Sequence, residues 1–119
     1  MLKLFSKNAS RDQNDQLVFR MAIELSFEAS FQVSYRDESN NLKIKRLRAS
    51  SWSVELLNPI DQATTIEFKV FVYSPNLSKD ENLKMMLYEN GELRAEKSFN
   101  ILAENEHAGW FSLQYRIEQ

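Results

Sequence analysis

The residues best suited to metal or acid–base chemistry lie in one short stretch. It reads Glu104-Asn105-Glu106-His107, and it contains the single histidine among the 119 residues. Carboxylate and imidazole groups are suitable ligands for a divalent metal. Consecutive residues of one loop rarely converge on a single ion, however, and there is no second histidine to complete a conventional site. We therefore expect a solvated acidic loop that holds no metal.

Other catalytic chemistry has little support in the residue types. The absence of cysteine removes thiolate zinc sites and cysteine nucleophiles. No Gly-x-Ser-x-Gly turn is present to expose a serine nucleophile at the end of a strand. The 17 acidic residues fall in expected turns or on the polar side of expected strands, where solubility places them. The sequence predicts a non-enzymatic protein without a cofactor.

The densest group of basic residues lies upstream of a tryptophan. It consists of Lys43, Lys45, Arg46 and Arg48, followed by Trp52. Such a group could bind an anionic ligand or a nucleic acid, with charge for phosphates and a ring for a base. In a strand, however, the two lysines point to one side and the two arginines to the other. The net charge of −2 also gives no general attraction to nucleic acid. Binding through residues 43–48 is therefore the alternative function, and nucleic acid is not the partner we expect first.

An aromatic surplus on one strand gives the leading hypothesis. Residues 64–73 alternate, and one side already forms a full core face from Ile66, Phe68, Val70 and Val72. The other side carries Glu67, Lys69, Phe71 and Tyr73. These aromatic rings are either covered by another segment, such as the apolar residues near the N-terminus (Leu2, Leu4 and Phe5), or exposed as a patch. The leading hypothesis is therefore a non-enzymatic interaction module that engages a protein partner or a second copy through this aromatic face or through an edge strand.

The elements that must position these groups are mostly strands. Residues 19–35 alternate between apolar and polar side chains, which is typical of a strand, and so long a strand must bend; the small pair Ala29-Ser30 is the expected corner. Further strands are expected at residues 42–48, 52–57, 64–73 and 111–117. The Asn90-Gly91 pair within residues 83–99 predicts a hairpin with a type I′ turn.

This pattern predicts an all-β protein: an antiparallel two-sheet β-sandwich of about seven strands, with a flattened β-barrel as the alternative. Residues 1–16 form a polar N-terminal segment that could add a short strand, and residues 17–119 form a single sandwich domain. No apolar stretch is long enough to span a membrane. We expect a cytoplasmic protein, provided that no signal peptide preceded this sequence.

Several short motifs resemble the small extracytoplasmic β-sandwich domains of the mycobacterial small membrane protein type. The likeness covers about Phe31 to Ile117. The motifs are Val33-Ser34-Tyr35, Trp52-Ser53-Val54-Glu55-Leu56, Glu89-Asn90-Gly91-Glu92-Leu93 and Trp110-Phe111-Ser112-Leu113-Gln114-Tyr115. The chain differs from such domains in having Ser51 where they favour proline and in its scarcity of glycine, and we expect no membrane anchor. The resemblance implies an immunoglobulin-like sandwich that is an accessory to a larger assembly, and it supplies no active-site residues.

Overall fold

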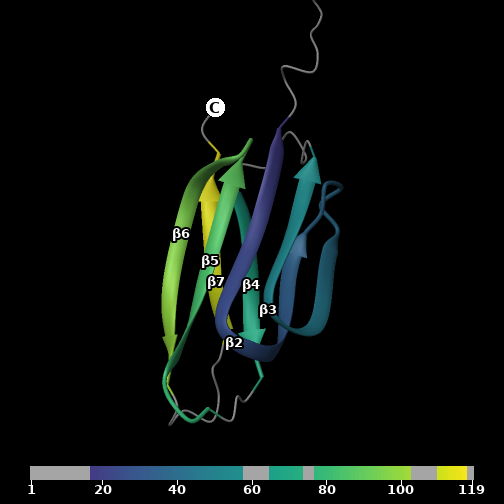
Figure 1. Ribbon diagram of the computed structural model, residues 1–119. Helices are drawn as coiled ribbons and strands as arrows, with labels where there is room; N and C mark the ends of the chain where they lie inside the picture. Colours follow the sequence, from purple (N-terminus) through teal and green to yellow (C-terminus); the bar gives the residue numbers. More distant parts are fainter. Residues whose placement is uncertain (1–16, 58–64, 74–76, 103–109, 118–119) are drawn as a thin grey trace, which may run out of the picture.

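A computed structural model describes residues 17–57, 65–73, 77–102 and 110–117, and within them it shows six strands (Figure 1). The strands are β2 (Val18–Arg36), β3 (Leu42–Leu57), β4 (Thr65–Val72), β5 (Glu81–Glu89), β6 (Glu92–Ile101) and β7 (Trp110–Arg116). The described residues contain no helix, and so none that could cross a membrane. The N-terminal segment 1–16 and the acidic loop with His107 lie outside the described residues.

Strand β2 organises the whole sheet because it is bonded to three other strands. It pairs with β3 on one side along nearly its entire length. On the other side, its first half pairs with β5 and its second half with β4. Strands β6 and β7 extend the sheet beyond β5 and β4, and every pairing is antiparallel.

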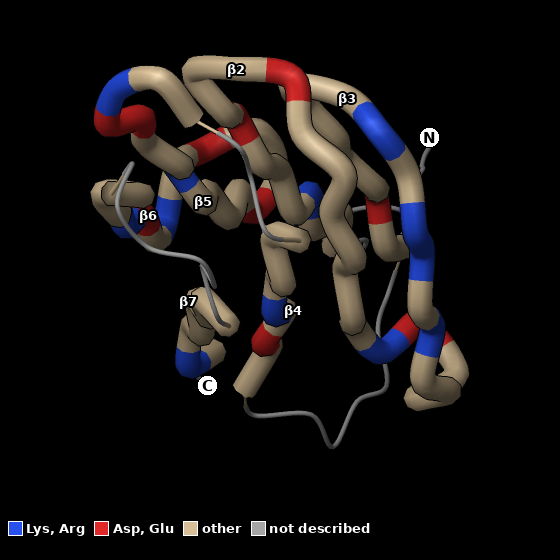
Figure 2. The backbone as a smooth tube through the Cα atoms, turned by 90° about the horizontal axis from the view of Figure 1, so that it is seen from below, with Lys and Arg blue, Asp and Glu red and all other residues tan. Residues whose placement is uncertain are grey.

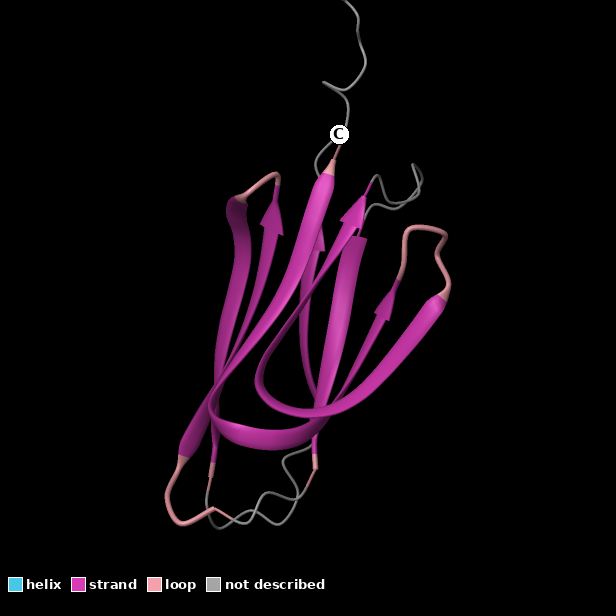
Figure 3. Ribbon diagram, turned by 45° about the vertical axis from the view of Figure 1, so that its right-hand side comes forward, coloured by secondary structure: helices cyan, strands magenta, loops and turns pink. Residues whose placement is uncertain are grey.

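The sheet bends sharply in the middle of β2 (Figure 3). Pairing with β5 ends at Leu25 and pairing with β4 begins at Phe31. The register with β3 shifts over the same stretch, between Glu24 and Ala29. The expected corner at Ala29-Ser30 lies within this switch of partners. The bend brings β6 and β7 together, and the rings of Phe99 and Phe111 meet there with centroids 4.9 Å apart.

The expectation of seven strands in two separate sheets is not confirmed. The segments 42–48 and 52–57, expected as two strands, form the single strand β3. Its residues Ala49 and Ser51 remain paired with β2 across the bend, opposite Ala29 and Glu24, so hydrogen bonding continues where a break was expected. The described residues form one antiparallel sheet that nearly closes on itself, which is nearer to the flattened barrel.

The alternating apolar residues of β2 form the centre of the core. Phe19, Met21, Ile23, Phe31 and Val33 are all at most 1% exposed. The second half of the sheet adds Phe68, Val70 and Val72, and β5 adds Leu83, Met85 and Leu87. Because the parity of β2 is unbroken through the bend, its large side chains face one interior in both halves.

The β5–β6 hairpin turns at Asn90-Gly91, as the sequence predicts. Both residues have positive φ, 50° for Asn90 and 87° for Gly91. A type I′ turn requires this sign at both central positions, and asparagine and glycine tolerate it best.

Candidate protein-binding face

Four strands present a continuous solvent-facing surface in the half of the sheet that follows the bend. We call it the outer face; it is the side of β3, β2, β4 and β7 opposite to the core. The register places Arg46, Gln32, Phe71 and Trp110 in one row across the four strands. Directly paired residues of antiparallel strands lie on the same face, so these four side chains are neighbours.

Three aromatic rings form a cluster at one end of this row. The centroids of Phe71 and Tyr73 lie 5.2 Å apart in an edge-to-face arrangement, and those of Phe71 and Trp110 also lie 5.2 Å apart. Trp110 is 54% exposed and Tyr73 39% exposed, whereas Phe71 between them is half-buried. The aromatic rings on the non-core side of β4 therefore lie on the surface in the described structure.

Gln32 links the aromatic cluster to a guanidinium group. Its Oε1 accepts a hydrogen bond from Arg46 Nε at 2.9 Å and a second one from the Tyr73 hydroxyl at 3.2 Å. Two rotatable side chains are thereby held in defined positions by one acceptor. The arginine is oriented beside the aromatic cluster and remains exposed to solvent.

The next row holds Arg48 beside Ser30. Arg48 donates a hydrogen bond to Ser30 Oγ at 3.4 Å, and its Nε lies 3.7 Å from a carboxylate oxygen of Glu28. Both charged side chains of this ion pair are more than half exposed, so the pair contributes little to stability. The Tyr73 amide donates to the carbonyl of Ser30 at 3.0 Å, which fixes the aromatic end of β4 against β2.

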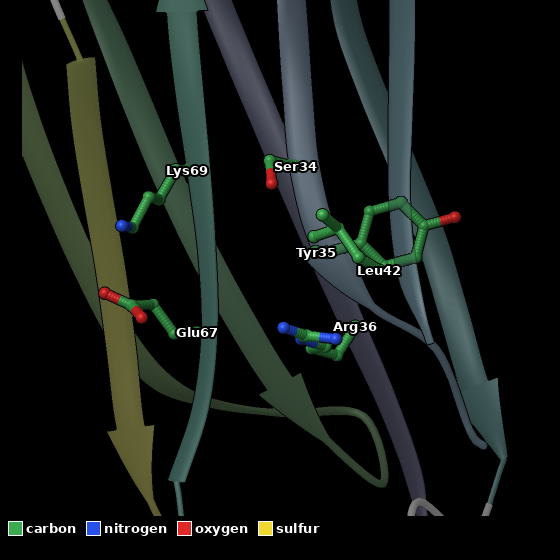
Figure 4. A pocket seen from close by; sticks show the side chains of 6 residues that line it. All are labelled: Ser34, Tyr35, Arg36, Leu42, Glu67 and Lys69. Atoms are coloured by element: carbon green, nitrogen blue, oxygen red, sulfur yellow. The ribbon is translucent and has the colours of Figure 1, made fainter. Parts of the chain in front are cut away.

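Two open depressions lie on the outer face, and one of them borders the aromatic cluster at Trp110. One is lined by Ser34, Lys69, Trp110 and Ser112, and the other by Ser34, Tyr35, Arg36, Leu42, Glu67 and Lys69. Figure 4 shows Glu67 and Lys69 projecting from β4 toward β7, while Arg36 projects from β2 toward β4. The four residues predicted for partner binding therefore share this face. Leu42 and Ile44 of β3 lie at its margin and are 52% and 50% exposed.

The structure does not gather all the residues of the alternative site. Lys43 and Lys45 stand opposite the core residues Tyr35 and Val33, whereas Arg46 and Arg48 belong to the outer face. Trp52 is half-buried and its ring packs 5.5 Å from that of Tyr35, on the core side of β3. The tryptophan and the two arginines therefore lie on opposite faces of the strand.

Two titratable groups beside the outer face have shifted pKa values with structural causes. The backbone amides of Asn41 and Ser39 donate to Asp37 Oδ1 at 2.9 Å each and lower the pKa of that carboxyl, and Lys43 lowers it further. Asp37 therefore closes the β2–β3 turn as a charged acceptor. Burial raises the pKa of Tyr35, and the nearby carboxylate of Asp37 adds to that increase.

Three exposed apolar residues of this face were not predicted from the sequence: Trp110, Leu42 and Ile44. Trp110 falls on the polar parity of its strand, beside Ser112 and Gln114, and that position could have indicated an exposed ring. Leu42 and Ile44 carried no such signal, because they alternate like a buried strand. They are exposed because β3 lies at the edge of the sheet, beside β2, and because their side chains are on the side away from the core.

Within the described ranges, no group of three or more acidic, histidine or cysteine side chains is placed to hold a metal. A scan against models of protein families finds no match to the chain, and a search of curated proteins finds none either.

Proposed function

We propose that the chain is a non-enzymatic interaction module whose outer face docks a protein partner. The observation that carries the proposal is the exposed ring cluster of Tyr73, Phe71 and Trp110 beside the oriented side chain of Arg46. Tryptophan, tyrosine and arginine are the residues most enriched among those that dominate binding energy in protein interfaces.

Restricted side-chain freedom adds to this argument. Binding orders flexible side chains at a cost of about 0.5–1.5 kcal/mol for each one that is immobilised. On the outer face, Gln32 already holds both Arg46 and Tyr73, and Phe71 supports both neighbouring rings. Part of the ordering cost is therefore met before a partner arrives.

The charge of the outer face favours a different protein over a second copy. Its cations are Arg36, Arg46, Arg48, Lys69 and Arg116, whereas its described acids are Glu28 and Glu67. A two-fold dimer would place this patch against itself and bring like charges together. An acidic partner surface would complement it, and a homodimer becomes an outcome of the test.

The resemblance described above supports the same kind of role. We propose that the two halves of the bent sheet act as the layers of a flattened, immunoglobulin-like sandwich, one of which presents the outer face to a larger assembly. The basic segment 43–48 offers less support for nucleic-acid binding, because its cations are divided between two faces and Trp52 packs on Tyr35.

Site-specific photo-cross-linking in the native host tests the proposal. The change Tyr73→p-benzoylphenylalanine places the reactive group on the outer face, and Lys97→p-benzoylphenylalanine on β6 is the matched exposed control. We expect cross-links to another protein from position 73, few from position 97, and loss of the former when Trp110→Lys is added. Equal cross-linking at the two positions, or cross-links to RNA alone, would contradict the proposal. Cross-links only to a second copy would show a homodimer instead.

A charge substitution checks that the cluster belongs to the surface. Tyr73→Glu should leave the circular dichroism spectrum and the unfolding midpoint nearly unchanged, because the Tyr73 side chain is partly in water already. If this variant unfolds, Tyr73 is a core residue and the assignment of the site fails.

A further inference from the structure

The outer face ends at β3, and this strand has a free backbone edge in the described structure. Strand β3 pairs with β2 alone among the described residues. From Leu42 to Ala49 the pairing is regular, without a register shift. A regular strand that is bonded on one side presents alternate N–H and C=O groups on the other side, and these can accept a further strand.

Several Lys and Arg residues lie along this edge strand (Figure 2). Lys43 and Lys45 project on the core side and Arg46 and Arg48 on the outer face, and all four are exposed. The described carboxylates near them do not neutralise the group. Lys43 lies 3.7 Å from Asp37 and Arg48 lies 3.7 Å from Glu28, while Arg46 bonds only to the neutral Gln32 among the described residues.

These cations favour an added strand that carries negative charge. The β3 edge of a second copy would place four cations against four cations, which opposes self-association. A strand with acidic residues at successive positions would instead meet a cation on each face. Cross-strand pairs of opposite charge contribute about 0.2–1 kcal/mol each. Leu42 and Ile44, at the start of the same edge, offer exposed apolar contacts on the outer face.

We propose that the Leu42–Ala49 edge of β3 binds an acidic, extended segment of the partner as an added strand. Acidic side chains of that segment lie opposite residues 45–48 on both faces, and an apolar side chain covers Leu42 or Ile44. The inference rests on the proposed function, since the rest of the partner docks on the outer face. Nucleic acid is disfavoured here because it has no backbone amides to continue the ladder of hydrogen bonds.

Fluorescence anisotropy with designed peptides tests strand addition. The probe is a labelled peptide of four glutamates followed by alternating valine and threonine, made also in the reverse order to determine strand direction. Two N-methylated versions each block one alternate set of amides. An added strand bonds through one set only, so one methylated peptide should bind about tenfold or more weakly while the other binds like the parent.

Charge variants on β3 identify the edge that is used. The double change Lys45→Glu with Arg46→Glu should weaken binding of the acidic peptide by about tenfold or more. The matched control Lys97→Glu, on the edge strand β6, should stay within about twofold. Amide hydrogen exchange supplies a second measurement, in which the peptide should slow exchange in residues 42–49 and not in β6.

Three results would overturn the inference: equal binding by both methylated peptides, equal binding by a lysine version of the probe, or tighter binding by an oligothymidine of about ten nucleotides. Failure here can be separated from failure of the proposed function. If cross-linking from position 73 persists while the acidic peptide does not bind, the outer face remains a docking site and only strand addition is wrong.

Discussion

Asn90 and Val18 are joined by two hydrogen bonds across the end of the sheet. The Val18 amide donates to Asn90 Oδ1 at 2.9 Å, and the Asn90 amide donates to the Val18 carbonyl at 2.8 Å. The turn of the β5–β6 hairpin thus fastens the first residue of β2. One asparagine both adopts the positive φ of the turn and fixes the position at which the central strand begins.

Replacing this asparagine should separate its two roles. Asn90→Gly keeps a residue that tolerates positive φ and loses only the side-chain hydrogen bond, so we expect a loss of about 1 kcal/mol in the free energy of unfolding. Asn90→Ala loses both the side-chain hydrogen bond and the tolerance of positive φ, so it should lower the free energy of unfolding by about 2 kcal/mol. Urea unfolding measures the two changes.

Asn40 provides the matched control for that comparison. It also has a positive φ, 66°, in the β2–β3 turn, but its side chain makes no described hydrogen bond. Asn40→Ala should therefore cost only the conformational part, about 1 kcal/mol. Equal costs for Asn40→Ala and Asn90→Ala would show that the bond to Val18 contributes nothing.

The turn at Asp37 should make stability depend on pH in the acid range. Hydrogen bonds from the Asn41 and Ser39 amides lower the pKa of Asp37 in the folded state, so folding favours the charged carboxylate. The stabilisation is complete above the unfolded pKa of about 3.9 and is lost as the pH falls through the lower folded value. Urea unfolding of the protein and of Asp37→Ala at a series of pH values should show a stability difference that narrows in this window. Asp37→Asn keeps an oxygen acceptor without the charge, so its free energy of unfolding should lie between those of the unchanged protein and of Asp37→Ala. A difference that is constant from neutral pH to below this window would contradict the explanation.

A serine holds the bend of β2 against the start of β5. Ser26 Oγ donates to Glu81 at 2.7 Å and accepts from the Asn82 amide at 2.8 Å. Ser26→Ala should lower the free energy of unfolding by about 1–2 kcal/mol. The control is Ser53→Ala on β3, whose hydroxyl makes no described hydrogen bond and which should change stability by less than about 0.5 kcal/mol. Similar effects of both changes would mean that the contact does not secure the bend.

Truncation of two adjacent residues of β7 should affect different properties, binding in one case and stability in the other. Trp110 belongs to the outer face and is 54% exposed, whereas Phe111 packs toward the core against Phe99. Trp110→Ala should change the free energy of unfolding by less than about 1 kcal/mol and reduce partner binding. Phe111→Ala should cost about 2–3 kcal/mol of stability, because it removes a partly buried ring. A larger loss of stability for Trp110→Ala would place that ring in the core.

Local patterns predicted the strands well and the connections between them less well. The alternation of residues 19–35 and the Asn90-Gly91 turn correspond to β2 and to the β5–β6 hairpin, because period and turn chemistry are properties of neighbouring residues. The small residues 49–51 were interpreted as a break. They remain in β3 because β2 bends beside them, and that depends on the partner strand.

The outer face was predicted only in part, because local patterns specify the face on which a residue lies but not which strands are neighbours. Parity on β4 indicated that Phe71 and Tyr73 share a face with Glu67 and Lys69. The register with β7 places Glu67, Lys69 and Phe71 on one face, and the ring of Tyr73 packs against that of Phe71. The contributions of Trp110 and of Arg46 depend on which strands lie beside β4, and no local pattern specifies strand order. The split of the basic segment was expected from parity, whereas the contact of Trp52 with Tyr35 required the β2–β3 register.

The dependence of both halves on β2 also affects synthesis of the chain. At about 5–20 residues per second, several seconds pass between the emergence of β2 from the ribosome and that of β5. During this interval β3 and then β4 can bond to β2, but the first half of β2, which includes Phe19, still lacks its neighbour β5. Ribosome-associated chaperones that bind apolar nascent segments should therefore contact the first half of β2 during this interval.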